Sequence, residues 1–107
     1  NLYRRRRAIV VRALRDLPGV RVLPMDGGLH AVVEHGRPER EVTAALEERG
    51  VLVSPLSAYW SGTSGRNGLV FGFGGVDDLG LARGLAEIRS LLARPLGLQV
   101  ISPTIEI

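Results

Sequence analysis

The stretch Val51–Val76 constrains the fold most, because two short apolar segments flank a loop rich in glycine and serine. The segments Val51–Ser54 and Gly68–Phe73 have the length and composition of β-strands. The loop between them carries Trp60, the only tryptophan of the chain, and Tyr59, one of its two tyrosines. The rest of the chain is expected to form a scaffold around this stretch.

The N-terminal part of the chain predicts a helix followed by a β-hairpin. Apolar residues at spacings of three, four and seven predict a helix over Asn1–Leu17, which Pro18-Gly19 ends. The strands Val20–Pro24 and Leu29–His35 are expected to pair across a turn at Asp26-Gly27-Gly28. The first helix begins without a clear N-cap, so we expect the chain to be cut from a larger protein at this point.

Two further helices complete the expected elements. The second helix starts with Pro38 at its first position, carries Val42 and Leu46 on its buried side, and ends at Gly50. The last helix is capped by Asp77 and ended by Pro95. Its apolar stripe has spacings of four, seven and eleven, over Leu81, Leu85, Ile88 and Leu92.

The element order is therefore α-β-β-α-β-β-α, which predicts an α+β fold. One mostly antiparallel sheet with the helices on one face, a two-layer sandwich, is the simplest architecture that buries each apolar face. Residues 1–94 are expected to form this domain. Residues 95–107 are apolar and rich in β-formers, and either an additional strand or a mobile tail fits them.

Composition excludes several classes of protein. The chain has 107 residues, 45% of them hydrophobic, which fits one globular domain rather than a disordered segment. It has no cysteine, and no apolar run approaches the ~18 residues that a membrane span needs. No signal peptide is visible, so we expect a cytoplasmic protein. All 14 basic residues are arginine, so the chain has no lysine for amine chemistry.

The run Arg4–Arg7, with Arg12 and Arg15, makes the first helix basic. Arginines of this kind can neutralise phosphates, so nucleic-acid binding is one interpretation. The alternative is a solvated helix face, because four consecutive arginines point all round a helix rather than along one edge. The second interpretation is favoured.

No complete catalytic or metal site is visible in the sequence. His30 and His35 are five residues apart in one expected strand, which places them on opposite faces and argues against a metal site. The glycines at Gly72–Gly75 match neither a dinucleotide fingerprint nor a P-loop, and no lysine follows them. No serine has an adjacent base, and the acids fit solvated faces and caps. We therefore expect no catalytic residue, no metal ligand and no cofactor-binding residue in this chain.

An ordered set of segments resembles the C-terminal small domain of fold-type I, pyridoxal-phosphate-dependent aminotransferases. Its branch of greatest similarity is the MocR-like regulators, in which a GntR-type winged-helix DNA-binding domain precedes an aminotransferase-like domain. The resemblance covers about Leu2–Leu92. The segments that carry it are Tyr3–Arg7, Pro18–Val20, Gly27–His30, Arg49–Val51, Val53–Tyr59 and Gly68–Gly74.

The resemblance implies what this chain lacks as well as its fold. The lysine that holds pyridoxal phosphate would belong to a large domain of the same protein, and DNA contacts to an N-terminal domain. The parent would be a homodimer, and this chain alone would hold no cofactor. The family motif Asn-x-x-Arg-hydrophobic-x-Phe, aligned on Asn67 and Phe73, places Val70 where an arginine binds the substrate carboxylate.

Three candidate effector-binding residues follow from this comparison. Tyr59 is expected to face the cleft or to serve packing, Arg66 to replace the missing arginine or to be solvated, and His30 to approach a ligand or to be structural. Three functions stay open. The chain is the small domain of a regulator closing over an amino-acid or amine effector, the small domain of a true aminotransferase, or a basic nucleic-acid-binding module.

Overall fold

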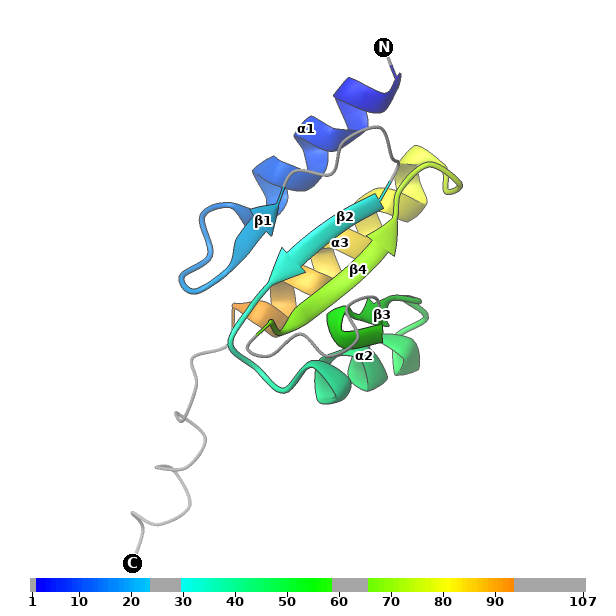
Figure 1. The fold of residues 1–107 in the computed structure, drawn as a ribbon. Coiled ribbons are helices and arrows are strands. Elements are labelled where there is room, and N and C mark those ends of the chain that lie inside the picture. Colours follow the sequence, from blue (N-terminus) through cyan, green and yellow to red (C-terminus); the bar gives the residue numbers. More distant parts are fainter. Residues whose placement is uncertain (1, 24–29, 59–65, 94–107) are drawn as a thin grey trace, which may run out of the picture.

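Four strands form one antiparallel sheet in the order β1-β2-β4-β3 (Figure 1). Their bounds are Arg21–Leu23 for β1, His30–Glu34 for β2, Ser54–Pro55 for β3 and Gly68–Gly72 for β4. β1 and β2 pair antiparallel, as the sequence predicts, and the predicted turn at Asp26-Gly27-Gly28 lies outside the described residues. β4 then pairs with β2 in the centre, and β3 takes the edge.

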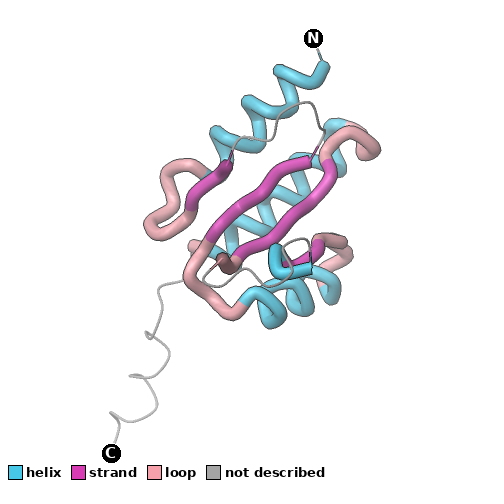
Figure 2. The backbone as a smooth tube through the Cα atoms, viewed as in Figure 1, coloured by secondary structure: helices cyan, strands magenta, loops and turns pink. Residues whose placement is uncertain are grey.

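Three helices accompany the sheet in this computed structural model, which describes residues 2–23, 30–58 and 66–93. They are α1 at Leu2–Leu14, α2 at Glu39–Glu48 and α3 at Asp78–Leu92. α3 lies behind the two central strands, α1 lies on the β1 side of the sheet, and α2 lies beside β3 (Figures 1 and 2). The predicted α+β fold with an antiparallel sheet is therefore confirmed.

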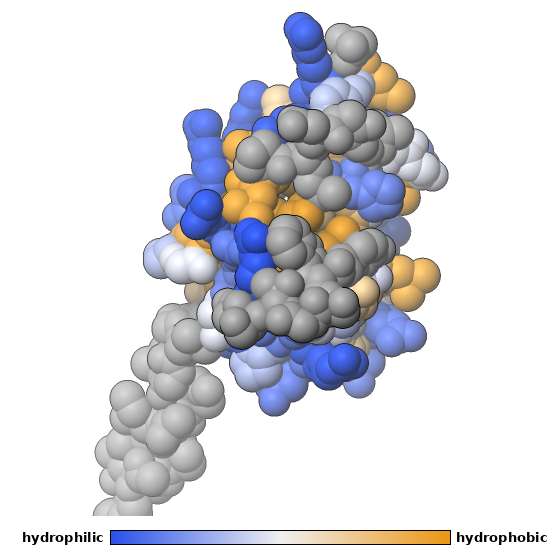
Figure 3. Space-filling view, in the orientation of Figure 1, coloured by the Kyte–Doolittle hydropathy of each residue, from blue (hydrophilic) through white to orange (hydrophobic). Residues whose placement is uncertain are grey.

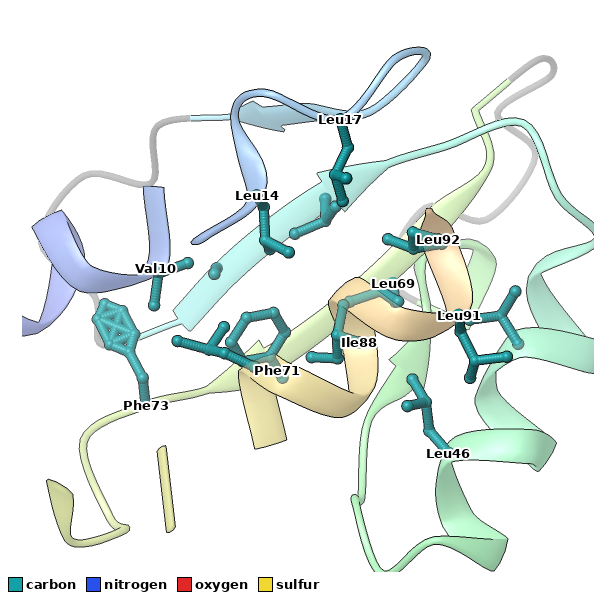
Figure 4. Packing of buried hydrophobic residues seen from close by; sticks show 14 of the residues in the cluster. Val10, Leu14, Leu17, Leu46, Leu69, Phe71, Phe73, Ile88, Leu91 and Leu92 are labelled. Atoms are coloured by element: carbon teal, nitrogen blue, oxygen red, sulfur yellow. The ribbon is translucent and has the colours of Figure 1, made fainter. Parts of the chain in front are cut away.

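The main core lies between the helices and one face of the sheet (Figure 4). Ala31 and Val33 of β2 and Leu69 and Phe71 of β4 alternate along their strands and are all buried in it. The period-two pattern of a half-buried strand thus sets which side chains meet the helices. The helices supply, among others, Val10, Leu14, Val42, Leu46 and the predicted stripe Leu81, Leu85, Ile88 and Leu92.

Several predicted boundaries are wrong by a few residues. α1 ends at Leu14 instead of Leu17, because the residue before Pro18 is disfavoured in a helix and the chain turns there, with Val20 N donating to Leu17 O at 3.2 Å. Leu17 is nevertheless buried, whereas Leu2, the first residue of α1, is 53% exposed.

The other boundary errors concern strands. Val20 and His35, predicted as strand ends, lie outside β1 and β2. Val51–Val53 are not part of a strand, since Val51 N still donates to Leu46 O of the preceding helix at 2.8 Å. β4 ends at Gly72 rather than Phe73.

The helix caps agree better with the sequence. The Asp77 side chain accepts a hydrogen bond from Gly80 N at 2.7 Å, which confirms it as the N-cap of α3. Gly50 follows α2 with a φ of 83°, a left-handed conformation that suits glycine. Pro38 is the N-cap of α2 rather than its first helical residue, because its ψ of 119° is extended. Pro95 and the segment 95–107 lie outside the described residues.

One arginine of the basic run is buried and holds the chain between β4 and α3. Arg6 Nη1 donates to Phe73 O at 3.0 Å and to Val76 O, and Arg6 Nη2 donates to Asp78 Oδ1 at 3.2 Å. Arg5 also reaches Asp78 Oδ1, at 3.3 Å. The interpretation of a solvated helix face is therefore wrong at Arg6, which is buried, whereas Arg4 and Arg5 are exposed.

Gly68 is required where β4 begins beside β2. A Cβ atom at this position would lie 2.1 Å from Val33 O and 2.9 Å from the Cα of Glu34. Both atoms belong to the backbone, which cannot move aside as a flexible side chain would. The close approach of the two central strands therefore depends on the missing side chain.

Among the described residues, no helix has the length and apolar character needed to cross a membrane.

Replacing Arg6 by methionine should destabilise the fold by about 3 kcal/mol, because two buried carbonyls lose a charged donor. Urea denaturation measures this loss. Arg12→Met is the matched control, since Arg12 is exposed on the same helix, and it should change stability by less than about 0.5 kcal/mol. Equal stabilities of the two variants would contradict the role of Arg6.

Gly68→Ala should cost about 2 kcal/mol or more, because the added methyl group forces the central strands apart. Thermal denaturation followed by circular dichroism compares it with Gly36→Ala, where no atom lies within 4 Å of the added Cβ. A stability of Gly68→Ala equal to that of the control would show that the strands do not approach as described.

Candidate functional site

The face of the sheet opposite the main core carries residues that the sequence singled out, namely His30, Arg66 and Val70. Directly paired residues of antiparallel strands share a face. His30 pairs with Gly72, Val32 with Val70, and Glu34 with Gly68. The side of the sheet that holds Val32 and Val70 is called the open face here, and it is the side seen in Figure 3.

The middle of the open face is a small apolar cluster. Val32, Val70 and Leu56 are buried against one another, and Leu23 packs beside them. Leu56 belongs to the 3-10 helix η1 (Leu56–Ala58) that follows β3, and it is fully buried. Hydrophobic surface gathers near the centre of this view, with hydrophilic side chains around it (Figure 3).

Val70 has a packing role in this cluster, with 4% of its surface exposed. The resemblance described above would place a carboxylate-binding arginine at this position, and the structure has an aliphatic side chain there on the open face. An aliphatic side chain offers no hydrogen-bond donor to a carboxylate. Val70 instead packs against Leu56 and so holds η1 to the sheet.

Arg66 lies at one end of the open face and is paired to an acid. Its Nε lies 2.9 Å and its Nη2 2.8 Å from Glu34 Oε2. The two side chains are 31% and 23% exposed, so the pair is half-buried. A ligand carboxylate would have to compete with Glu34 for this guanidinium.

His30 lies at the opposite end of the same face and is exposed. It lies four positions before Glu34 in β2, which corresponds to about 14 Å along an extended strand. Tyr3 and Arg7 of α1 line a small hollow with it. The structure therefore places His30 and Arg66 on one face without bringing them together. Tyr59, the third candidate, lies outside the described residues.

Glu39 is a candidate that the sequence pattern missed, since it was interpreted only as an acid suited to the first turn of α2. Its Oε1 accepts hydrogen bonds from Gly68 N at 3.1 Å and from Ser57 N at 3.4 Å. One carboxylate thus joins η1 to the start of β4. Burial, the largest influence, opposes ionisation, but the hydrogen bonds from Ser57 and Gly68 and the charge of Arg40 lower the pKa of Glu39 overall.

Asn67 makes a second connection at the same end of the sheet. Its Nδ2 donates to His35 O at 2.8 Å and to Arg37 O at 2.6 Å, while His35 N donates to Asn67 O at 3.1 Å. The asparagine of the aligned motif therefore ties the start of β4 to the turn between β2 and α2. A side-chain amide that spans two carbonyls fixes the direction of both segments.

His35 is buried within that turn, with 7% of its surface exposed. Its Nδ1 accepts from Arg37 N at 3.1 Å, and its Nε2 is buried without a hydrogen-bond partner among the described residues. Burial lowers the pKa of His35 most; the nearby Glu39 carboxylate raises it, Arg37 lowers it, and the net direction is down. His35 is therefore a neutral, structural histidine.

The glycines before α3 do not form an anion site. Asp77 and Asp78 occupy the start of this helix, where a bound phosphate would meet like charge. In the described ranges 2–23, 30–58 and 66–93, no three histidine, aspartate or glutamate side chains cluster as a metal site would require.

Stability should fall as the pH drops below about 6.5, because unfolded His35 binds a proton more readily than the buried side chain. The decrease should level off below the lowered pKa of the folded state. Urea denaturation between about pH 5.5 and 8 measures it. His35→Asn, which keeps an acceptor for Arg37 N, should flatten this profile, whereas His30→Ala should leave it unchanged; an unaltered profile in His35→Asn would refute the assignment.

No protein-family model matches the chain, but a curated protein is similar to it. Over 87 residues, which are 81% of the chain, it is 49% identical to the HTH-type pyridoxine biosynthesis transcriptional regulator PdxR of Corynebacterium glutamicum. The matched part is 19% of that protein, so the chain spans about a fifth of the length of this curated relative. Over most of its length, this chain is therefore similar to a part of a transcriptional regulator.

Proposed function

We propose that this chain is the small domain of a pyridoxal-phosphate-binding, aminotransferase-like transcription regulator of the MocR type. It closes over an amino-acid or amine effector held by a large domain of the same protein. The observation that carries the proposal is the 49% identity to a transcriptional regulator over 81% of the chain. The α+β fold with the expected element order supports it.

The residues of this chain are not suited to hold the cofactor themselves. Pyridoxal phosphate, when bound, supplies an aldehyde that a lysine amine can hold, and this chain has no lysine. The start of α3 carries two aspartates and is unsuited to the phosphate group. The cofactor is therefore assigned to the large domain, and the DNA contacts to a winged-helix domain.

The open face is the surface proposed to meet the large domain and the effector. Its apolar centre of Val32, Val70 and Leu56 excludes water, and the Arg66–Glu34 pair lies at one end. At position 70 itself, this face offers an effector carboxylate an aliphatic side chain instead of a charged partner. Effector binding would favour a closed arrangement of the two domains and thereby shift the DNA-binding state of a dimeric parent.

A true aminotransferase is the alternative, and it requires the same fold. Val70 argues against ordinary recognition of an amino-acid substrate, because the expected charged partner is replaced by packing. The named relative is a regulator rather than an enzyme. Both observations favour regulation.

The product of the whole reading frame should bind DNA with an affinity that changes when an effector of the pyridoxal or amine class is added. Electrophoretic mobility shift with its upstream region, with and without pyridoxal phosphate, measures this. The 107-residue chain is the control. It should shift no DNA at moderate salt and should acquire no visible absorbance from pyridoxal phosphate bound through a side chain.

Two results would overturn the proposal. Turnover of amino acids by the whole product, without DNA binding, would favour the enzyme. Tight DNA binding by the 107-residue chain that weakens steeply with salt would favour a basic binding module.

A further inference from the structure

An Asn-Gly pair lies where β4 begins, and the proposed function makes no use of its reactivity. Asn67 directly precedes Gly68, whereas Asn1, the other asparagine of the chain, precedes Leu2. Glycine has no Cβ atom to shield its backbone nitrogen, so this nitrogen can approach the side-chain carbonyl carbon of the residue before it. Asn67 is half-buried and Gly68 is buried. A chemically reactive pair therefore lies in an ordered part of the sheet.

The reaction open to such a pair is deamidation, in which water is the only co-reactant. Hydroxide takes the proton of Gly68 N, this nitrogen forms a bond to Asn67 Cγ, and the bond between Cγ and Nδ2 breaks. The leaving nitrogen takes a proton from water and departs as ammonia, which leaves a five-membered succinimide ring. Water then adds to one of the two ring carbonyl carbons and opens the ring. The product is aspartate or isoaspartate.

The folded chain holds the peptide group between the two residues on both sides. Gly68 N donates to Glu39 Oε1 at 3.1 Å, and Asn67 O accepts from His35 N, also at 3.1 Å. Burial opposes the ionisation of Glu39, but its hydrogen bonds lower its pKa overall, so this acceptor is a charged carboxylate at neutral pH. A negative acceptor stabilises the N–H group, and the nitrogen must leave it before it can attack.

The side-chain amide that would leave is held as well. Asn67 Nδ2 donates to His35 O at 2.8 Å and to Arg37 O at 2.6 Å. Gly68 has little room to move, since a Cβ atom on it would already lie 2.1 Å from Val33 O. The nitrogen and the carbon that must form the new bond are thus fixed by separate partners. Deamidation therefore requires the start of β4 to open first.

The products do not fit the closed structure. A carboxylate at position 67 would face the carbonyl oxygens of His35 and Arg37 without a proton to donate to either. Isoaspartate adds one carbon atom to the main chain directly before Gly68, where β4 approaches β2 too closely for a Cβ atom. Either product therefore opposes the return of β4 to its place.

We propose that Asn67 is a deamidation site that Glu39 and the turn before α2 protect. Opening of this end of the sheet converts Asn67 to aspartate or isoaspartate and prevents the sheet from closing again. The chain thus carries an irreversible record of each opening at the start of β4. This inference goes beyond the proposed function, because the reaction needs neither the cofactor nor an effector.

Peptide mass spectrometry of the 107-residue chain, kept at mildly alkaline pH, measures the loss of the Asn67 amide. Guanidinium chloride that unfolds the chain should speed this loss at least about tenfold, because the folded chain reacts only through its open fraction. Asn1, which leucine follows, is the internal reference and should react slowly in both states.

Glu39→Ala should speed the loss in native buffer at least about fivefold, because Gly68 N loses its charged acceptor. Glu41→Ala is the matched control, since Glu41 is exposed in the same first turn of α2, and it should leave the rate unchanged. Val10→Ala, which weakens the main core elsewhere, should leave the rate unchanged too, because the opening is local. Circular dichroism should show that all three variants are folded.

Chain that has deamidated, separated by ion exchange, should unfold at a lower urea concentration than untreated chain, and so should Asn67→Asp. Equal rates in the folded and the unfolded chain would overturn the proposal. A Glu39→Ala rate no higher than that of Glu41→Ala, or matched by that of Val10→Ala, would overturn the protection by Glu39. Deamidated chain as stable as untreated chain would show that the reaction does not prevent closure.

Discussion

The antiparallel pairing of β2 with β4 is the interaction on which the rest of the structure depends. The two strands pair along their whole length, from His30 with Gly72 to Glu34 with Gly68. Alternate residues of the pair face the main core, and the others form the open face. A shift of register by one residue would exchange the two faces, so this pairing fixes both the core and the proposed ligand side.

Polar side chains hold the two ends of β4, where the hydrogen bonding of the sheet stops. Arg6 holds the backbone after β4 to α1, through Phe73 O and Val76 O. Asn67 and Glu39 hold the backbone before β4 to α2 and to the turn that precedes it. The direction in which β4 enters and leaves the sheet is therefore set by the buried Arg6 and by the partly buried Asn67 and Glu39.

Much of the fold could be predicted because its signals are local. The stripe of α3, its Asp77 cap and the glycine after α2 each depend on residues within a few positions of one another. The roles of Arg6 and Glu39 could not be predicted, since their partners lie 67 and 29 residues away in sequence, at Phe73 and Gly68. A run of four arginines gives no sign of which one is buried.

The candidate site could be predicted only in part, because its contacts also join residues far apart in the sequence. Strand alternation predicts that His30 and Glu34 share one face, but it does not predict the ion pair between Arg66 and Glu34. The aligned motif singled out position 70, but the burial of Val70 against Leu56 depends on how η1 folds onto the sheet. The sequence thus singled out individual residues of the open face, and the three-dimensional contacts distinguish its packing residues from its charged end.

The central claim is that this open face looks toward a cofactor-bearing domain of the same protein. The most direct measurement is the crystal structure of the whole reading-frame product with pyridoxal phosphate. The account predicts that a lysine of a large domain holds the cofactor and that the face containing Val32, Val70 and the Arg66–Glu34 pair borders that site. A structure in which α1 and α3 face the cofactor, or in which the product has no such site, would contradict it.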